Sequence, residues 1–477
     1  MANPSFYWHD YETWGVNPRV DRPAQFAGIR TDENLEIIGE PLMIYAQPTV
    51  DFLPHPEAVL ITGITPQQAM AEGIDEARFF KAIHTEFQQP NTCIVGYNNI
   101  RFDDEVTRFG FYRNFIDSYA YSWQNGNSRW DVLDLMRLTH ALRPEGIHWP
   151  QREDGVASFK LTDLTEANGI EQVGAHDALV DVKATIAVAK LIKQKQPRLF
   201  DFYFNLRSKK RVADLINLNN PEILLHVSGM FPADQGCLAP IMPLLAHPTN
   251  ANEIICYNLR FSPEDFLQLS AEQIQQKLYT RTLDLADGEQ RLPLKGVHLN
   301  KSPALAPVST LTPEQAEKWQ IDWDKINRHR DQLLADPGLI ARLREVYSVD
   351  RAFEKGDADS ALYDGFIGSD DRLRCNQLLA ASPEKLAEWP ENSFHDQRLK
   401  TLLFRYRARN FPQTLTEDES LRWQRFCQSR LVDGDFGASL TVEQFQQQLL
   451  TLAQREQGKR EQHLLDQLSS WAQEIFS

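Results

Sequence analysis

The opening part of the chain carries short apolar runs separated by turn-forming residues. Such runs predict β-strands, and they cover residues 6–12, residues 25–30 and residues 35–39 with their continuation. A further short apolar run at 92–97 is typical of a buried strand. A chain that begins with strands and then alternates strands with helices is predicted to form an α/β layer fold with a mixed sheet.

Helical patterns lie between and after these strands. Thr65 is expected to cap a helix that begins at Pro66, since a threonine side chain can accept a hydrogen bond from a free N–H of the first turn. Asp177 is expected to cap a long helix that runs to about residue 193. Other helices are predicted around 104–111 and over 130–142 and 159–168.

The pattern changes after Gln196 and Pro197. Residues 222–310 hold short β-like runs, broken by proline, glycine and asparagine, with a helical insert near 271–278. The runs lie at 223–227, 253–257 and 296–299. This region is expected to form a small β-barrel or sandwich with helical additions.

The last third of the chain is predicted to be mostly helical from about Pro313. Residues 354–372 are acidic and contain several glycines and serines, so we expect a linker there. Residues 372–477 are expected to form a helical bundle. The domains are therefore predicted at 1–196, 197–352 and 353–477.

Composition limits the class of protein. The chain has 477 residues, enough for two to four domains, and its 42% hydrophobic residues allow each of them a core. The five cysteines are scattered without paired spacing, which argues against a disulfide framework and a zinc site and fits a reducing cytoplasm. There is no signal-peptide pattern and no run of eighteen apolar residues, so we expect a cytoplasmic protein that spans no membrane.

The net charge of −16 disfavours a protein that coats nucleic acid broadly. Net charge describes the far field, however, and a basic groove on an acidic body would still bind a strand. Arginines and aromatic residues lie close together between positions 108 and 137, and the densest basic run is 207–211. Such residues suit phosphates and bases, although the aromatic ones are as often core and the basic run as often a solvated helix face.

Asp10 and Glu12 are two residues apart on a predicted strand, so both side chains project to one side. Oxygen ligands on one face suit magnesium, and hydrolysis by two metals needs ions roughly 3.5–4 Å apart beside the scissile phosphate. The alternative for this pair is a solvent-facing polar stripe. Apolar and aromatic residues before the pair weaken that alternative.

Asp103 follows the predicted buried strand and a short polar loop, and it stands at the start of the next helix. A carboxylate at the end of a strand could join the first two acids. The alternative is a helix cap, for which Asp103 or Asp104 would serve.

His176 and Asp181 are five residues apart, so on one continuous helix they would not share a face. With Asp177 as the cap, His176 lies on the preceding loop and Asp181 in the first turns of the helix. A histidine near neutral pKa can deprotonate an attacking water, although an isolated one is more often a surface residue. The order of these motifs along one chain favours a two-metal phosphodiester nuclease.

With these residues the chain resembles the DEDDh branch of the DnaQ-like 3′→5′ exonucleases. Asp10, Glu12, Asp103 and Asp181 match the four acids of that branch, and His176 matches its histidine. Longer stretches resemble the bacterial exonuclease I family in particular, from Asp-Tyr-Glu-Thr at 10–13 to Tyr-Arg-Ala-Arg-Asn-Phe-Pro at 406–412. Others are 21–27, 60–66, 96–108, 141–147 and 196–201.

The resemblance implies a fold and an activity. It implies an α/β, DnaQ-like (RNase H-like) nuclease domain with a mixed sheet, then an SH3-like β-barrel domain and a C-terminal helical domain. It implies processive degradation of single-stranded DNA from the 3′ end to 5′-mononucleotides, in DNA repair and recombination. The implied cofactor is Mg²⁺, as two ions that Mn²⁺ can replace, and the implied state is a monomer.

The resemblance also implies contacts with substrate and partner. The implied substrate contacts are Glu12, Arg108, Tyr119, Trp123, Arg137, Phe159, Lys160 and Lys209. Lys160 departs from the family, which often has arginine there, and a lysine loses bidentate phosphate geometry. Arg143 and Phe202 match the pocket that binds the acidic C-terminal tail of single-stranded DNA-binding protein.

Two other functions compete with this one. An RNA-trimming or proofreading exonuclease would share the active site, but such relatives are usually shorter or tied to a polymerase. A non-catalytic binding module on a decayed nuclease fold would not be expected to keep all five active-site residues. The segment 354–372 is expected to pass across the substrate groove, where Tyr363 and Phe366 could stack on bases.

Overall fold

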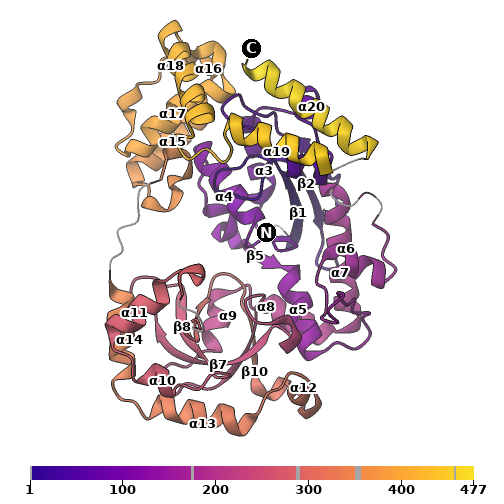
Figure 1. Cartoon of the computed structure of the whole chain (residues 1–477), viewed down its shortest axis with the longest axis vertical. Coiled ribbons are helices and arrows are strands. Elements are labelled where there is room, and N and C mark those ends of the chain that lie inside the picture. Colours follow the sequence, from indigo (N-terminus) through magenta and orange to yellow (C-terminus); the bar gives the residue numbers. More distant parts are fainter. Residues whose placement is uncertain are drawn as a thin grey trace. The chain divides into compact units, whose positions relative to one another are not determined.

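The computed structural model describes residues 3–172, 174, 177–285, 290–349, 356–455 and 458–476. The chain divides into two compact units. The first unit takes residues 1–128, 172–186 and 353–477, and the second takes 129–171 and 187–352. The C-terminal helices therefore belong to the same compact unit as the first strands of the chain (Figure 1).

The first unit is built on a mixed sheet, as predicted. Its strands are β1 (Ser5–Thr13), β2 (Pro23–Thr31), β3 (Leu42–Tyr45) and β4 (Thr92–Gly96), in the order β3-β2-β1-β4. β1 is antiparallel to β2 and parallel to β4. The strands predicted at 6–12, 25–30 and 92–97 are confirmed, and β1 occupies the middle of the sheet with a partner on each side.

The core of this sheet is largely aromatic. Phe26 of β2 and Tyr11 of β1 meet with their ring centres 4.9 Å apart, and helix α3 (Glu76–Phe87) adds further rings. Helix α4 (Asp103–Arg113) packs against α3 and the sheet. The buried rings of this cluster are Tyr7, Tyr11, Phe26, Phe79, Phe80, Phe87, Phe111 and Tyr121. Aromatic contacts of this size give β1 a rigid setting.

The remaining helices of the nuclease region follow the predicted caps. Helix α1 spans Pro56–Thr62, and α2 (Pro66–Glu72) begins after Thr65, whose side chain accepts from the Gln68 N–H at 3.1 Å. Helix α7 (Ala178–Lys195) begins directly after Asp177. Residues 128–131 form the short strand β5 (Ser128–Asp131), so the helix predicted from 130 starts later, as α5 (Val132–Leu142). The helix predicted at 159–168 is α6 (Leu161–Ala167).

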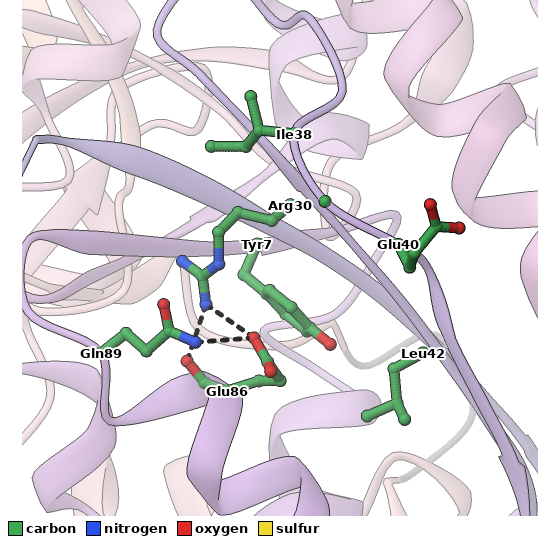
Figure 2. A pocket seen from close by; sticks show the side chains of 8 residues that line it. Tyr7, Arg30, Ile38, Glu40, Leu42, Glu86 and Gln89 are labelled. Atoms are coloured by element: carbon green, nitrogen blue, oxygen red, sulfur yellow. Dashed lines mark hydrogen bonds and ion pairs between the residues drawn. The ribbon is translucent and has the colours of Figure 1, made fainter.

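The third strand, predicted at 35–39 with its continuation, is found in the continuation as β3, which begins at Leu42, while residues 35–39 contribute a bridge from Ile37 to Thr31 and no strand. Leu35 has a left-handed backbone (φ 68°) and closes a tight turn, so the chain cannot continue as a strand there. Ile38 still donates to the Arg30 carbonyl at 2.9 Å, but the next residues leave β2. Figure 2 shows the hollow of about 260 Å³ beneath them, where Arg30 pairs with Glu86 at 3.0 Å. The Glu86 carboxylate accepts hydrogen bonds there from both Arg30 and Gln89.

The second unit contains a five-stranded antiparallel sheet in the order β10-β6-β7-β8-β9. Three strands match predicted runs: β6 (Leu224–Val227), β8 (Glu253–Asn258) and β9 (Leu294–His298). β7 (Leu238–Ala246) and β10 (Ala304–Pro307) were not predicted, because prolines interrupt both sequences. β7 accommodates Pro243 at a bulge, where its register against β8 shifts.

The helices of the second unit surround this sheet and follow it. Besides α5 and α6, they are α8 (Pro197–Asn205), α9 (Lys209–Asp214), α10 (Glu264–Leu267), α11 (Ala271–Tyr279), α12 (Pro313–Lys318), α13 (Trp323–Leu334) and α14 (Leu339–Ser348). The predicted helical insert is α11, which Ser270 and Gln273 begin with a reciprocal capping box. No helix in the described ranges of either unit is long and apolar enough to span a membrane.

The C-terminal region is helical, as predicted, and it packs on the nuclease sheet. Its helices are α15 (Ser369–Leu379), α16 (Pro383–Ala387), α17 (Gln397–Asn410), α18 (Glu417–Gln428), α19 (Val442–Arg455) and α20 (Lys459–Phe476). Figure 1 shows α19 and α20, in yellow, beside the strands of the first unit. Phe445 and Leu468 from these helices share one core with Trp14 and Val59.

The prediction that the acidic segment 354–372 is a linker is wrong for the residues described from 356 onward. Residues 358–364 form a short 3₁₀ helix, η6 (Ala358–Asp364), and Asp359 within it is 3% exposed. The Asp359 carboxylate accepts from Arg405, Arg409 and Arg430 at 3.0, 2.6 and 2.9 Å. Asp359, and Asp357 beside it, are therefore counterions of buried arginines.

The same arginines reach the N-terminal part of the unit. Arg409 also bonds Asp51 at 2.8 Å, and Arg430 lies 3.6 Å from the same carboxylate. The neighbouring arginine charges hold the pKa of Asp51 and of Asp359 well below the usual aspartate range, although burial alone would raise both. This network of ion pairs joins the C-terminal helices to the nuclease sheet.

Replacing Asp359 by alanine is expected to lower the free energy of unfolding by about 3–5 kcal/mol, because it leaves several buried arginines without their shared partner. Since the folded-state pKa of this aspartate is depressed, its stabilisation is present above about pH 4 and is lost as the pH falls below that. Chemical denaturation at pH 7 and at about pH 3 measures both effects. Asp370→Asn, at an exposed site on α15, is the control. A loss no larger than that of Asp370→Asn would contradict the structural role of the network.

Candidate active site

The first two carboxylates come from β1. Successive side chains of a strand point to opposite faces, so Asp10 and Glu12 project from the same face while Tyr11 between them enters the core. The Tyr11 hydroxyl shares a hydrogen bond with the Thr107 hydroxyl of α4, at 2.9 Å. This buried contact fixes β1 against α4, so the two acids project from a rigid frame.

Asp103 joins them from the first residue of α4. Phe102 occupies the cap position, so neither Asp103 nor Asp104 caps this helix. The Asp103 side chain accepts a hydrogen bond from the Tyr11 N–H, at 3.2 Å, on the backbone between Asp10 and Glu12. The start of α4 and the middle of β1 are therefore joined directly at the acids.

Asp181 comes from the first turn of α7. The side chain of Asp177 caps this helix by accepting from two N–H groups of the first turn, at 3.0 and 3.2 Å. Gln25, the cross-strand partner of Glu12, accepts from the first N–H of the helix, that of Ala178, at 3.1 Å. These bonds place the first turn of α7 beside β1 and β2, which brings Asp181 to the other acids.

The acids form one cluster in the first unit. Asp10, Glu12 and Asp181 each offer a carboxylate oxygen, and these oxygens lie within 4.8 Å of one another. Burial and then repulsion by Asp103, Glu12 and Asp181 raise the pKa of Asp10 well above its usual value. Burial and then repulsion by Asp181 and Asp103 raise the pKa of Glu12 to about 8. Ionising these groups together is therefore costly in the protein alone.

The cluster fits a divalent cation. Its ligands are carboxylate oxygens, which hard cations such as Mg²⁺ and Mn²⁺ prefer, and a double positive charge would relieve the repulsion that raises their pKa values. Asp103 contributes charge to the same site through its effect on Asp10 and Glu12. The described part of the chain thus supplies the four acids that the sequence predicted, in one place.

The loop before α7 adds a residue that the sequence did not predict. Gln172 donates from its side-chain amide to the Asp181 carboxylate at 2.7 Å and orients it. Nothing in the local sequence distinguishes this glutamine, because its role depends on the fold returning the loop to α7. His176, the predicted general base, lies outside the described residues.

Three predicted substrate contacts lie in the first unit with the acids. Arg108 of α4 holds its guanidinium 5.4 Å from the centre of the Tyr119 ring, so the structure brings these two together. Trp123 has a 65% exposed side chain, which leaves its ring free to meet a base. Arg108 is only 7% exposed and is ion-paired with Glu105 at 2.9 Å.

The other predicted substrate contacts lie in the second unit. Phe159 is partly buried against the ring of His140, with the centres 5.4 Å apart, and Lys160 beside it is exposed before α6. Arg137 pairs with an aspartate of its own helix at 2.9 Å. Lys209, at the start of α9, donates to the Asn252 side chain at 2.6 Å. Of these four, Lys160 and Lys209 are exposed, and Arg137 and Phe159 are partly buried.

The predicted partner-binding residues are also in the second unit. Arg143 ends α5, and its guanidinium donates to the carbonyls of Leu142 and Thr310. Phe202 lies partly buried on α8. Arg143 therefore already fixes the end of α5, and only its remaining donors are available to a partner.

Protein-family models match successive stretches of the chain. A model described as Exonuclease matches residues 7–189, and the Exonuclease I SH3-like domain matches residues 207–349. The Exonuclease I C-terminal domain matches residues 356–475. The expected succession of a nuclease, an SH3-like and a C-terminal domain is confirmed, while the boundaries at 196 and 352 stay predictions.

Curated and solved relatives agree with these matches. Exodeoxyribonuclease I of Haemophilus influenzae is 48% identical over 440 residues, 91% of this chain and 93% of that protein. Exonuclease I of Methylocaldum szegediense superposes with a TM-score of 0.94 at 46% identity, covering 99% of this chain and 100% of the relative. The zinc-bound form of E. coli exonuclease I in complex with single-stranded DNA gives 0.94 at 44% identity, covering 100% of both chains. The chain therefore belongs to the exonuclease I family of nucleases.

Proposed function

We propose that this protein is a 3′→5′ exonuclease that degrades single-stranded DNA to 5′-mononucleotides by two-metal hydrolysis. The observation that carries the proposal is the convergence of Asp10, Glu12 and Asp181 oxygens within 4.8 Å. Support for the substrate comes from the E. coli relative, which has been solved with single-stranded DNA. RNA cleavage by the same site is the second candidate, and matched DNA and RNA oligonucleotides distinguish the two.

Each residue of the site has a distinct task in this reaction. Asp10, Glu12, Asp103 and Asp181 would hold the cations, and Gln172 keeps the Asp181 carboxylate in one orientation. Bound Mg²⁺ ions would neutralise charge on the scissile phosphate and favour ionisation of the attacking water. His176, two residues before the start of α7 in the sequence, would take the proton of that water. Mn²⁺ would replace Mg²⁺ at oxygen ligands of this kind.

Basic and aromatic side chains are proposed to contact the strand. Arg108, Arg137, Lys160 and Lys209 would contact phosphates, while Tyr119, Trp123 and Phe159 would contact bases. Glu12 would contact the terminal nucleotide as well as metal. The family relation supports these assignments, and the 65% exposure of Trp123 suits it to base contact.

The wider role follows from the same family relation. We place the enzyme in the cytoplasm, as a monomer that acts in DNA repair and recombination. Arg143 and Phe202 would bind the acidic C-terminal tail of single-stranded DNA-binding protein, since a basic residue beside an aromatic one suits a terminal carboxylate and an apolar side chain.

Two substitutions are expected to separate metal binding from proton transfer. Asp181→Ala removes a metal ligand and is expected to abolish cleavage of a 3′-labelled single strand, as excess EDTA should for the unaltered protein. His176→Ala is expected to slow cleavage by roughly 10²–10⁴-fold and to change the acidic limb of the pH–rate profile, while strand binding survives. Single-turnover cleavage with Mg²⁺ measures both. Substantial cleavage by Asp181→Ala would contradict the metal site, and an unchanged profile for His176→Ala would make the histidine structural.

Processive digestion is expected if the later domains enclose the strand. An enclosed strand leaves only lengthwise, so many nucleotides should be removed before release, and binding should weaken with salt as phosphates are exchanged for ions. The test starts digestion of a long 3′-labelled strand and then adds excess unlabelled competitor. Products that stop after one or two nucleotides would show that the protein encloses no strand.

A further inference from the structure

The C-terminal region contacts helix α4 through Tyr363, among other residues. Tyr363, in η6, donates to the carboxylate of Glu105 on α4, whose two oxygens lie 2.8 and 2.7 Å from the phenol oxygen. The Tyr363 ring also meets the edge of Phe109 on the same helix, with the ring centres 5.4 Å apart. Figure 1 shows α4 beside the C-terminal helices of this unit. Tyr363 is thus fixed on α4 by its ring and by its hydroxyl.

Glu105 also binds the guanidinium of Arg108. Its Oε1 accepts from Nη1 of Arg108 at 2.9 Å, one turn along α4, and that guanidinium lies over the Tyr119 ring. The Nε of Arg108 is buried and has no hydrogen-bond partner among the residues described. Glu105 therefore holds one guanidinium nitrogen, and the Tyr363 hydroxyl also lies close enough to act on Arg108 directly.

The chemistry of Tyr363 suits this task. Burial raises the pKa of its hydroxyl well above the usual value for tyrosine, so the hydroxyl remains a donor at neutral and alkaline pH. A glutamate side chain on a helix surface has several rotamers, and a second donor restricts it to the one that faces Arg108. Without the hydroxyl, Glu105 and Arg108 would still form an ion pair, but the Glu105 side chain would adopt more than one rotamer and the guanidinium more than one orientation.

We propose that Tyr363 is a positioning residue, which fixes Glu105 and through it aims the Arg108 guanidinium at a phosphate of the bound strand. This inference rests on the proposed function, since it takes Arg108 as a strand contact. The C-terminal domain would then assist phosphate binding by Arg108, and this role does not require Tyr363 to stack on a base. The carboxylate cluster is not touched, so the effect belongs to strand binding and not to the chemical step.

Tyr363→Phe tests the hydroxyl while keeping the ring. It is expected to raise KM for a single-stranded oligonucleotide roughly tenfold, the size of one hydrogen bond to a charged group, with kcat unchanged. Anisotropy of a labelled oligonucleotide in EDTA should show the same loss of affinity without cleavage. In a Glu105→Ala background, Tyr363→Phe should have a clearly smaller effect, because only the direct contact of the hydroxyl with Arg108 remains.

Tyr112→Phe is the matched control. Tyr112 lies on the same helix, and its buried hydroxyl makes no hydrogen bond among the described residues, so its removal should leave KM, kcat and the melting temperature unchanged. Tyr363→Phe should melt close to this control. A melting temperature well below the control, with kcat and KM altered together, would assign the hydroxyl to folding and overturn the proposal.

The remaining outcomes separate the possible failures. Normal binding by Tyr363→Phe with impaired binding by Tyr363→Ala would mean that the ring stacks on bases, which overturns the role of the hydroxyl. The same loss in the Glu105→Ala background would overturn the path through Glu105. If the unaltered protein binds the oligonucleotide but does not cleave it, the proposed function fails, and weaker binding by Tyr363→Phe still supports the positioning role. If the unaltered protein does not bind at all, both proposals are overturned.

Discussion

Ionised carboxylates repel one another at the distances that separate Asp10, Glu12 and Asp181, and the first unit holds them together in spite of that repulsion. The aromatic core beneath β1 and the bond from the Tyr11 N–H to Asp103 keep the acids from moving apart. The raised pKa of Glu12 records the cost of this arrangement. A rigid frame around mutually repelling oxygens is what a cation site requires, because the ion then supplies the attraction that the protein lacks.

The same unit also buries two acids that are paired with arginines and need no cation from outside. Asp51 and Asp359 are as deeply buried as any acid of the site, yet arginines surround them and lower their pKa values. Those acids need no further partner, and they join the C-terminal helices to the sheet. The counterion distinguishes the two kinds of acid. The protein supplies arginines to the structural acids, whereas the acids of the site need a cation from solution.

The sequence predicted the elements whose signals are local. Thr65 and Asp177 begin the helices expected of them, and the strand pattern around Asp10 was clear. The four acids were predictable because each lies on a strand or at the start of a helix, and their order matches one family.

What the sequence could not predict depends on contacts between distant residues. The burial of Asp359 arises only when its arginine partners converge, so the acidic segment resembled a linker. Gln172 acquires its role from a loop that returns to α7. The prolines of β7 argued against a strand, although a bulge accommodates one of them. The left-handed backbone of Leu35 prevents a strand at 35–39, although the composition there suited one.

The most direct test of the account is the binding of Mn²⁺ to the purified protein at pH 6 and pH 8. Because the pKa of Glu12 is raised to about 8, protons compete with the metal below that pH. Calorimetry in buffers of different ionisation enthalpy should therefore show binding that tightens from pH 6 to pH 8 and releases protons, and that is lost in Asp10→Asn. Binding that is independent of pH, or equally tight in Asp10→Asn, would contradict the claim that these acids form a cation site.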